Sequence, residues 1–181
     1  MKNKTNQDRI SYFSAQLKLI LTTFIILIPT LTLAYWLFFN SLQAAGFVIE
    51  LPVEITTEID LITRLLAFLV CLLPITVAIY AAVQLRRLFS LYQQGIIFSY
   101  DNVICFKRMG LALLAWVIVS TISDTLLSLA LTIQNPVGER LLTIGFGSSE
   151  MTTLITGSVI LVISWVMKEA VEMKHEQEYT V

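Results

Sequence analysis

Apolar residues along the 181-residue chain gather in four long blocks, which polar and charged segments separate. The blocks cover about residues 17–39, 61–85, 109–133 and 151–167. A helix rises about 1.5 Å per residue and the hydrocarbon core of a bilayer is about 30 Å thick, so one crossing needs roughly 20 apolar residues. The pattern predicts four transmembrane helices, of which the fourth needs flanking residues to reach full length.

The distribution of Lys and Arg predicts which way these helices face. Ten of the twelve lie near the N-terminus, in the connection 86–108 or in the tail 168–181, and only Arg64 and Arg140 lie in or near the other connections, 40–60 and 134–150. Positively charged loops resist translocation, so the two termini and the inner loop 86–108 should be cytoplasmic. We therefore expect an all-α integral membrane four-helix bundle, formed as a single domain by residues 1–181.

The inner loop should contain a helical hairpin. Apolar residues keep helical spacing from Leu85 to Tyr92, and Gly95 is a suitable residue for ending the second helix. Ser99 can cap the third helix, and Asp101 suits the positive end of its dipole. The sequence thus predicts a cytoplasmic hairpin between the second and third spans.

The first outer loop shows a different period. Apolar and polar residues alternate through 47–56, as in a strand, although Pro52 restricts it to a sheet edge. Thr57 and Asp60 can cap the second span. We expect an ordered loop, folded over the outer mouth of the bundle.

Composition excludes several functional classes. Apolar residues make up 56% of the chain and charged residues 14%, with a net charge of −1, so a soluble domain and direct nucleic-acid binding are both disfavoured. Cys71 and Cys105 form no CxxC pair and His175 is the only histidine, which argues against a thiol relay or a metal cage. No catalytic motif is present, so we expect a non-enzymatic protein without metal or cofactor.

Asp124 is the leading candidate for an intramembrane site, because a charge near a span centre costs on the order of 2.5 to 3.5 kcal/mol. Ser120, Thr121 and Ser128 extend a polar stripe around it on the third span. One interpretation is a site for a proton, a cation or a small polar ligand. The other, which we favour, is hydrogen bonding between helices that secures their packing.

Arg64 is the expected partner of Asp124, because helical rise places the two side chains about 9 Å apart in height on neighbouring antiparallel helices. The alternative is that Arg64 reaches the headgroups and that hydroxyl groups alone satisfy Asp124. Small residues in the second and fourth spans, including Ala67 and Gly157, let backbones approach and permit a homo-oligomer.

Short motifs in the inner loop and tail carry a family resemblance. Gly95, Phe98-Ser99, Asn102 and Arg108, with the acidic ending that contains Glu176 and Glu178, resemble the bacterial membrane family catalogued as domain of unknown function 2975. The chain has Gln177 and Tyr179 where that family's ending has Asn and Leu.

The resemblance implies an inner-membrane protein without assigned activity, whose relatives are often encoded beside a small helix-turn-helix regulator. It makes the seven motif residues candidates for binding such a cytoplasmic partner: Gly95, Phe98, Ser99, Asn102, Arg108, Glu176 and Glu178. The alternative is a subunit of a small transporter or channel that uses Asp124, with oligomerisation supplying the path.

Overall fold

The protein is entirely helical in the computed structural model, which describes residues 2–47, 51–53, 55, 58–133 and 140–179. Within these residues the helices are α1 Lys2–Leu37, α2 Phe39–Ala44, α3 Leu61–Gln93, α4 Tyr100–Thr132 and α5 Ser148–Tyr179. No strand occurs in this part of the chain, so the all-α class is confirmed.

Four of the helices are long and apolar enough to cross a membrane, as the hydrophobic pattern predicts. Both α3 and α4 have 33 residues, which corresponds to about 50 Å of helix and exceeds the hydrocarbon thickness by about 20 Å. The long helices therefore extend beyond the apolar blocks. The short helix α2 was not predicted from the sequence.

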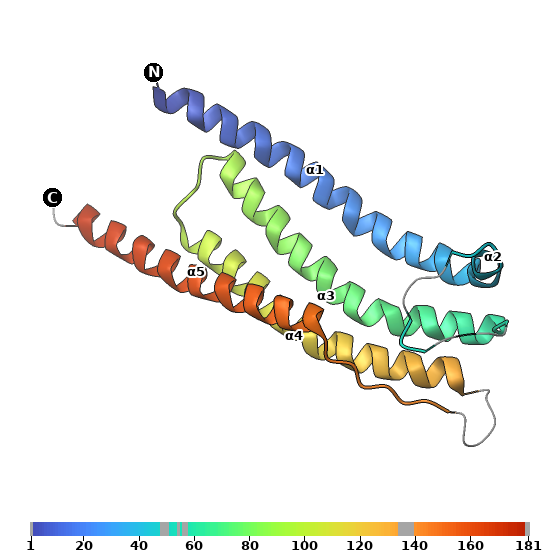
Figure 1. Ribbon diagram of the computed structural model, residues 1–181. Helices are drawn as coiled ribbons and strands as arrows, with labels where there is room; N and C mark the ends of the chain where they lie inside the picture. The colour runs from blue at the N-terminus through green and yellow to red at the C-terminus, as the bar shows by residue number, and fades with distance from the viewer. Residues whose placement is uncertain (1, 48–50, 54, 56–57, 134–139, 180–181) are drawn as a thin grey trace.

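The long helices lie in an open row rather than in a closed bundle (Figure 1). Extensive contacts join α1 to α3, α3 to α4, and α4 to α5, so α1 and α5 form the two edges of the row. Because lipid can cover apolar helix faces, a membrane protein has no need to close its helices around a central core. α4 has the most buried apolar segment of the four candidate spans, and α1 has the least.

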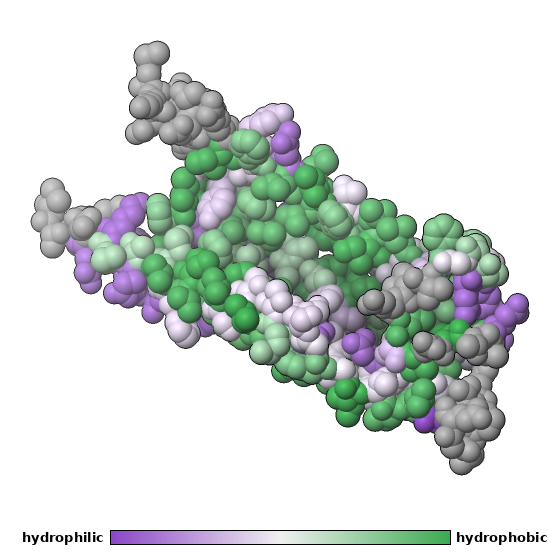
Figure 2. All heavy atoms as spheres, in the orientation of Figure 1, coloured by the Kyte–Doolittle hydropathy of each residue, from purple (hydrophilic) through white to green (hydrophobic). Residues whose placement is uncertain are grey.

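The two ends of this row differ. We call the end that carries both termini and the α3–α4 connection the terminal end, and the opposite end, with α2 and the α4–α5 connection, the loop end (Figure 1). Termini on one side agree with an even number of crossings. Hydrophobic atoms dominate the middle of the visible face, and hydrophilic atoms gather towards the ends (Figure 2).

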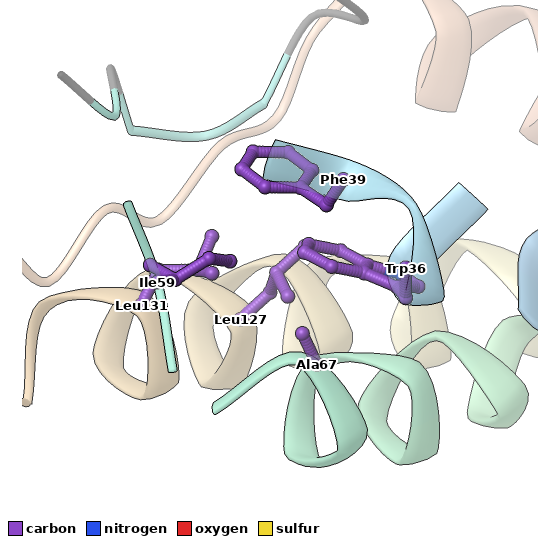
Figure 3. Close-up of a cluster of buried hydrophobic side chains, with 6 residues drawn as sticks. All are labelled: Trp36, Phe39, Ile59, Ala67, Leu127 and Leu131. Atoms are coloured by element: carbon purple, nitrogen blue, oxygen red, sulfur yellow. The ribbon is translucent and has the colours of Figure 1, made fainter. Parts of the chain in front are cut away.

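At the loop end, aromatic and aliphatic side chains from α1, α2, α3, α4 and the segment before α3 form a buried cluster (Figure 3). Its members are Trp36, Phe39, Ile59, Ala67, Leu127 and Leu131. The Trp36 and Phe39 rings stack with centroids 5.3 Å apart. The cluster thus ties α1 to α4 at this end, across the width of α3.

The first outer loop folds over this cluster, as expected, but its described residues form no strand. Leu51 and Ile55 pack against the cluster. Two side chains of α2 hydrogen-bond to backbone carbonyls of the loop. Asn40 Nδ2 donates to Ile59 O (3.1 Å), and Gln43 Nε2 donates to Ile55 O. These side-chain bonds replace the ladder that a strand would need. Thr57 lies outside the described residues, and Asp60 occupies the N-cap of α3 without a side-chain cap bond.

Two glycines set the crossing of α4 and α5. A Cβ atom at Gly157 would lie 3.1 Å from Leu113 Cβ and 3.2 Å from Gly110 O. A Cβ atom at Gly110 would lie 2.7 Å from Leu161 Cγ. The absence of side chains at both positions lets the two backbones approach closely, as the small-residue pattern indicates.

Candidate functional site

Asp124 lines a pocket at the loop end, between α1, α3, α4 and the first outer loop. The pocket has a volume of about 420 Å³ and is lined by Leu31, Thr32, Tyr35, Trp36, Leu51, Pro52, Cys71, Asp124 and Leu127. Most of these side chains are apolar or aromatic. The pocket therefore surrounds one carboxylate with a largely hydrophobic wall.

The hydroxyl groups of the predicted polar stripe do not satisfy Asp124. Ser120 Oγ and Thr121 Oγ1 both donate to Val117 O (3.1 and 2.9 Å), and Ser128 Oγ donates to Thr125 O (2.8 Å). Each of these three donors is thus used within α4. The bonds that these hydroxyls donate are local to the helix and form no shell around the carboxylate.

Hydroxyls of α4 also bond to other segments, and Ser128 of the stripe does so in addition to its bond within the helix. Ser123 Oγ donates to Val70 O of α3 (3.0 Å), and Ser128 Oγ accepts from Thr143 N (3.2 Å) in the segment before α5. Thr132 Oγ1 accepts from Leu141 N (3.3 Å) in the same segment. The packing role expected for the stripe therefore belongs to Ser123, Ser128 and Thr132.

The expected ion pair between Arg64 and Asp124 is not formed. Arg64 Nη1 donates to Leu37 O (2.8 Å) at the end of α1. The last carbonyls of a helix have no partner within it and carry partial negative charge, so they attract a guanidinium group. Arg64 closes the end of α1, which a height comparison between α3 and α4 could not indicate.

Within the described part of the chain, no hydrogen bond or ion pair is found for the Asp124 carboxylate. The charge acting on it is that of Glu150, another acid, whose Oε2 atom accepts from Gly147 N (2.7 Å) at the start of α5. The two acids therefore add to each other's negative potential near the pocket.

At the terminal end, the hairpin has the caps that the sequence predicts. Gly95 follows α3 with φ +77°, a conformation that favours glycine, and Ser99 Oγ accepts from Asn102 N (3.4 Å) at the start of α4. The hairpin turn is therefore confirmed, with α3 ending at Gln93 and α4 beginning at Tyr100.

The side chain of Asn102 holds the hairpin turn together by hydrogen bonds to its backbone. Its side chain is completely buried, and Nδ2 donates to Ile96 O (3.0 Å) and to Ile97 O. Because Asn102 has no accessible surface, it contacts no partner while this turn is intact. The turn explains why Asn102 belongs to the motif. Any direct contact with a partner must come from its exposed neighbours.

The tail lies beside the hairpin. α5 continues to Tyr179, and the rings of Tyr100 and His175 stack with centroids 5.8 Å apart. Phe98, at the tip, is 54% exposed, and Ile96 and Ile97 are also exposed. The hairpin and tail thus form one composite surface, which we call the terminal surface.

Three other predicted contact residues have different positions. Arg108 is exposed but lies eight positions beyond Tyr100, which is about 12 Å along α4. It lines a separate groove with Tyr80 and Leu111, so it is not part of the hairpin tip. Glu176 is exposed on α5, and the side chain of Glu178 lies outside the described residues.

Sequence reasoning missed the aromatic wall of the pocket. Tyr35 and Trp36 lie near the end of the first span, where interfacial aromatic residues are common, and that position was the available signal. It also missed the ion pair between Arg87 Nη2 and Asp101 Oδ1 (2.9 Å), which joins α3 to α4 at the terminal end.

Comparison with known families identifies the family of this chain. Residues 52–181 match the model of a family described as a protein of unknown function, DUF2975. The chain belongs to this family. The match covers the hairpin, the tail and Asp124, but α1, which forms one wall of the Asp124 pocket, lies outside it. No curated protein and no solved structure matches the chain of this DUF2975 member.

Proposed function

We propose that this DUF2975 member is a regulatory or interaction protein of the bacterial inner membrane that engages a soluble partner through its terminal surface. The observation that carries the proposal is the stack of Tyr100 on His175, which makes one surface from the two elements that bear the family motifs. Apolar side chains of Ile96, Ile97 and Phe98 are exposed there. Such a patch at the end of a protein is typical of a contact site.

Charge supports a cytoplasmic location for this surface. Ten of the twelve Lys and Arg belong to segments at the terminal end, and loops rich in these residues stay in the cytoplasm. Reporter fusions should therefore report Met1, Gly95 and Val181 inside, and Val53 and Gly138 outside. A periplasmic signal at Gly95 would overturn the orientation, and with it the proposal of a cytoplasmic partner.

The resemblance suggests the class of partner, a small helix-turn-helix regulator. Such a protein carries a basic DNA-binding face. The ending of this chain contains Glu172, Glu176 and Glu178, which can complement a basic face electrostatically. Holding a regulator at the membrane would keep it from its DNA, so the protein would tune transcription without binding nucleic acid itself.

Capture of the intact protein from its native membrane tests the proposal. Phe98→Ala should weaken recovery of the soluble partner at least tenfold, as should removal of residues 176–181. Phe146→Ala is the matched control, because Phe146 is 57% exposed, close to the 54% of Phe98, but lies in the connection at the loop end. Equal recovery in all variants, with unchanged transcripts, would contradict the proposal.

A second candidate is a subunit of a small transporter or channel that uses Asp124. The pocket around this carboxylate favours it, although the open row requires further copies of the chain to enclose a path. Ion flux in reconstituted vesicles that depends on Asp124, and is lost in Asp124→Asn, would support this function over a regulatory one.

A further inference from the structure

The Asp124 pocket combines a carboxylate that has no bonding partner among the described residues with a wall that suits an organic group. Several donors of the same region bond to other groups: the stripe hydroxyls bond within α4, and Arg64 Nη1 bonds to Leu37 O. Thr32, the pocket's hydroxyl on α1, donates to Ile28 O (2.9 Å). A carboxylate in such surroundings is costly unless a cation or a proton neutralises it.

The wall excludes a hard metal ion as the natural occupant. Ca²⁺ and Mg²⁺ take about six oxygen ligands, whereas leucines and aromatic rings make up most of this lining. A volume of about 420 Å³ falls in the range of pockets that hold small organic molecules. Tyr35 and Trp36 add aromatic rings, which attract organic cations.

We infer that this pocket binds an amphiphilic organic monocation, such as a substituted ammonium with a hydrocarbon or aromatic tail. The ammonium lies against Asp124, where Glu150 adds to the negative potential. The tail packs against Leu31, Leu51 and Leu127. This binding site is independent of the terminal surface and of the partner proposed for it.

The first outer loop is the cover of the site. Leu51 and Pro52 line the pocket directly, and Pro52 O accepts from Thr143 Oγ1 (3.4 Å) in the second outer connection. This bond joins the two connections at a residue of the pocket wall. A ligand here contacts α1, α3, α4 and the loop at once.

Fluorescence of Trp36 can report binding, because this indole lines the pocket. We would replace Trp116 and Trp165 by Phe and place the protein in nanodiscs of phosphatidylglycerol, which carries neither an amine nor a quaternary ammonium group. The probe is benzyltrimethylammonium, and the control ligand is neopentylbenzene, which has the same shape without charge. A saturable signal is expected for the cation, with affinity at least tenfold above that of the neutral isostere.

Asp124→Asn should lower the affinity for the cation at least tenfold and leave the affinity for the neutral isostere unchanged. Asp101→Asn is the matched control, since Asp101 lies on the same helix at the terminal end. If the Asn variant fails to fold, Asp124→Glu is measured in its place, and this variant should retain cation binding because it keeps the carboxylate. Equal binding of both ligands, equal binding in the Asn variant, or no saturable signal would overturn the inference. Competition by phosphatidylethanolamine alone would reassign the pocket to a lipid amine.

Discussion

Two polar side chains on α4 show how differently one helix can use such groups. Asn102, near the beginning of α4, is completely buried and donates to two carbonyls of the hairpin. Asp124, 22 positions further along, lines a pocket, and its carboxylate has no bond to the described residues. Both looked like functional candidates in the sequence.

The difference teaches that the partners of a polar group, rather than its burial, indicate its role. The amide of Asn102 satisfies backbone groups that the turn would otherwise leave without partners, so it stabilises the fold. The carboxylate of Asp124 makes no bond to the described residues, so it is the group of the two that a bound cation would neutralise. We therefore assign folding to the first residue and ligand binding to the second.

The largest expected effect comes from Asn102→Ala, which leaves the carbonyls of Ile96 and Ile97 without their donor. In this partly buried turn each lost hydrogen bond costs about 0.5–1.5 kcal/mol, so we expect a loss of about 1–3 kcal/mol. Thermal unfolding in detergent measures it. Gln94→Ala is the control, because Gln94 is exposed in the same turn. Similar melting of both variants would contradict the folding role.

Gly157→Leu should affect partner capture at the terminal end but not ligand binding at the loop end. A side chain at Gly157 must displace the α4 backbone near Gly110, at a cost of about 1–3 kcal/mol. Because α5 contributes the tail, partner capture should fall, whereas the Asp124 pocket has no lining residue on α5 and should keep its ligand. Gly145→Leu is the control, since a Cβ atom there meets nothing within 4 Å. Loss of both activities would show that the ends are coupled.

Asp124→Asn should stabilise the protein in the absence of cation, the opposite of its expected effect on binding. Removing an unpaired charge is worth about 1 kcal/mol here, which raises the melting temperature by about 2–4 °C for a chain of this size. A melting temperature lower than that of the wild type would mean that the carboxylate has a partner within the fold.

The smallest expected effect is the coupling between Arg64 and Asp124. Arg64 Nη1 bonds to Leu37 O, so Arg64→Leu and Asp124→Leu should change stability additively, within about 0.5 kcal/mol. A double-mutant cycle scored by thermal stability measures the coupling. A larger favourable coupling energy would be evidence for the ion pair that the sequence alone predicts.

The sequence determined the features that depend on local chemistry and on the bilayer. The lengths of the apolar blocks predicted four crossings, because hydrocarbon thickness and helical rise set the required length. Gly95 and Ser99 predicted the hairpin turn, because a left-handed residue and a side-chain acceptor end and begin helices by local geometry. These features need only neighbours along the chain.

Only the tertiary structure decided which distant groups meet. The strand-like period of 47–56 has no strand among its described residues, because Asn40 and Gln43 bond the backbone of the loop that follows α2. Arg64 bonds to the end of α1 rather than to Asp124, and Trp36 packs in one cluster with Leu127 of α4. Helix period gives the height of a residue but not its neighbour, since packing in lipid leaves several helix arrangements open.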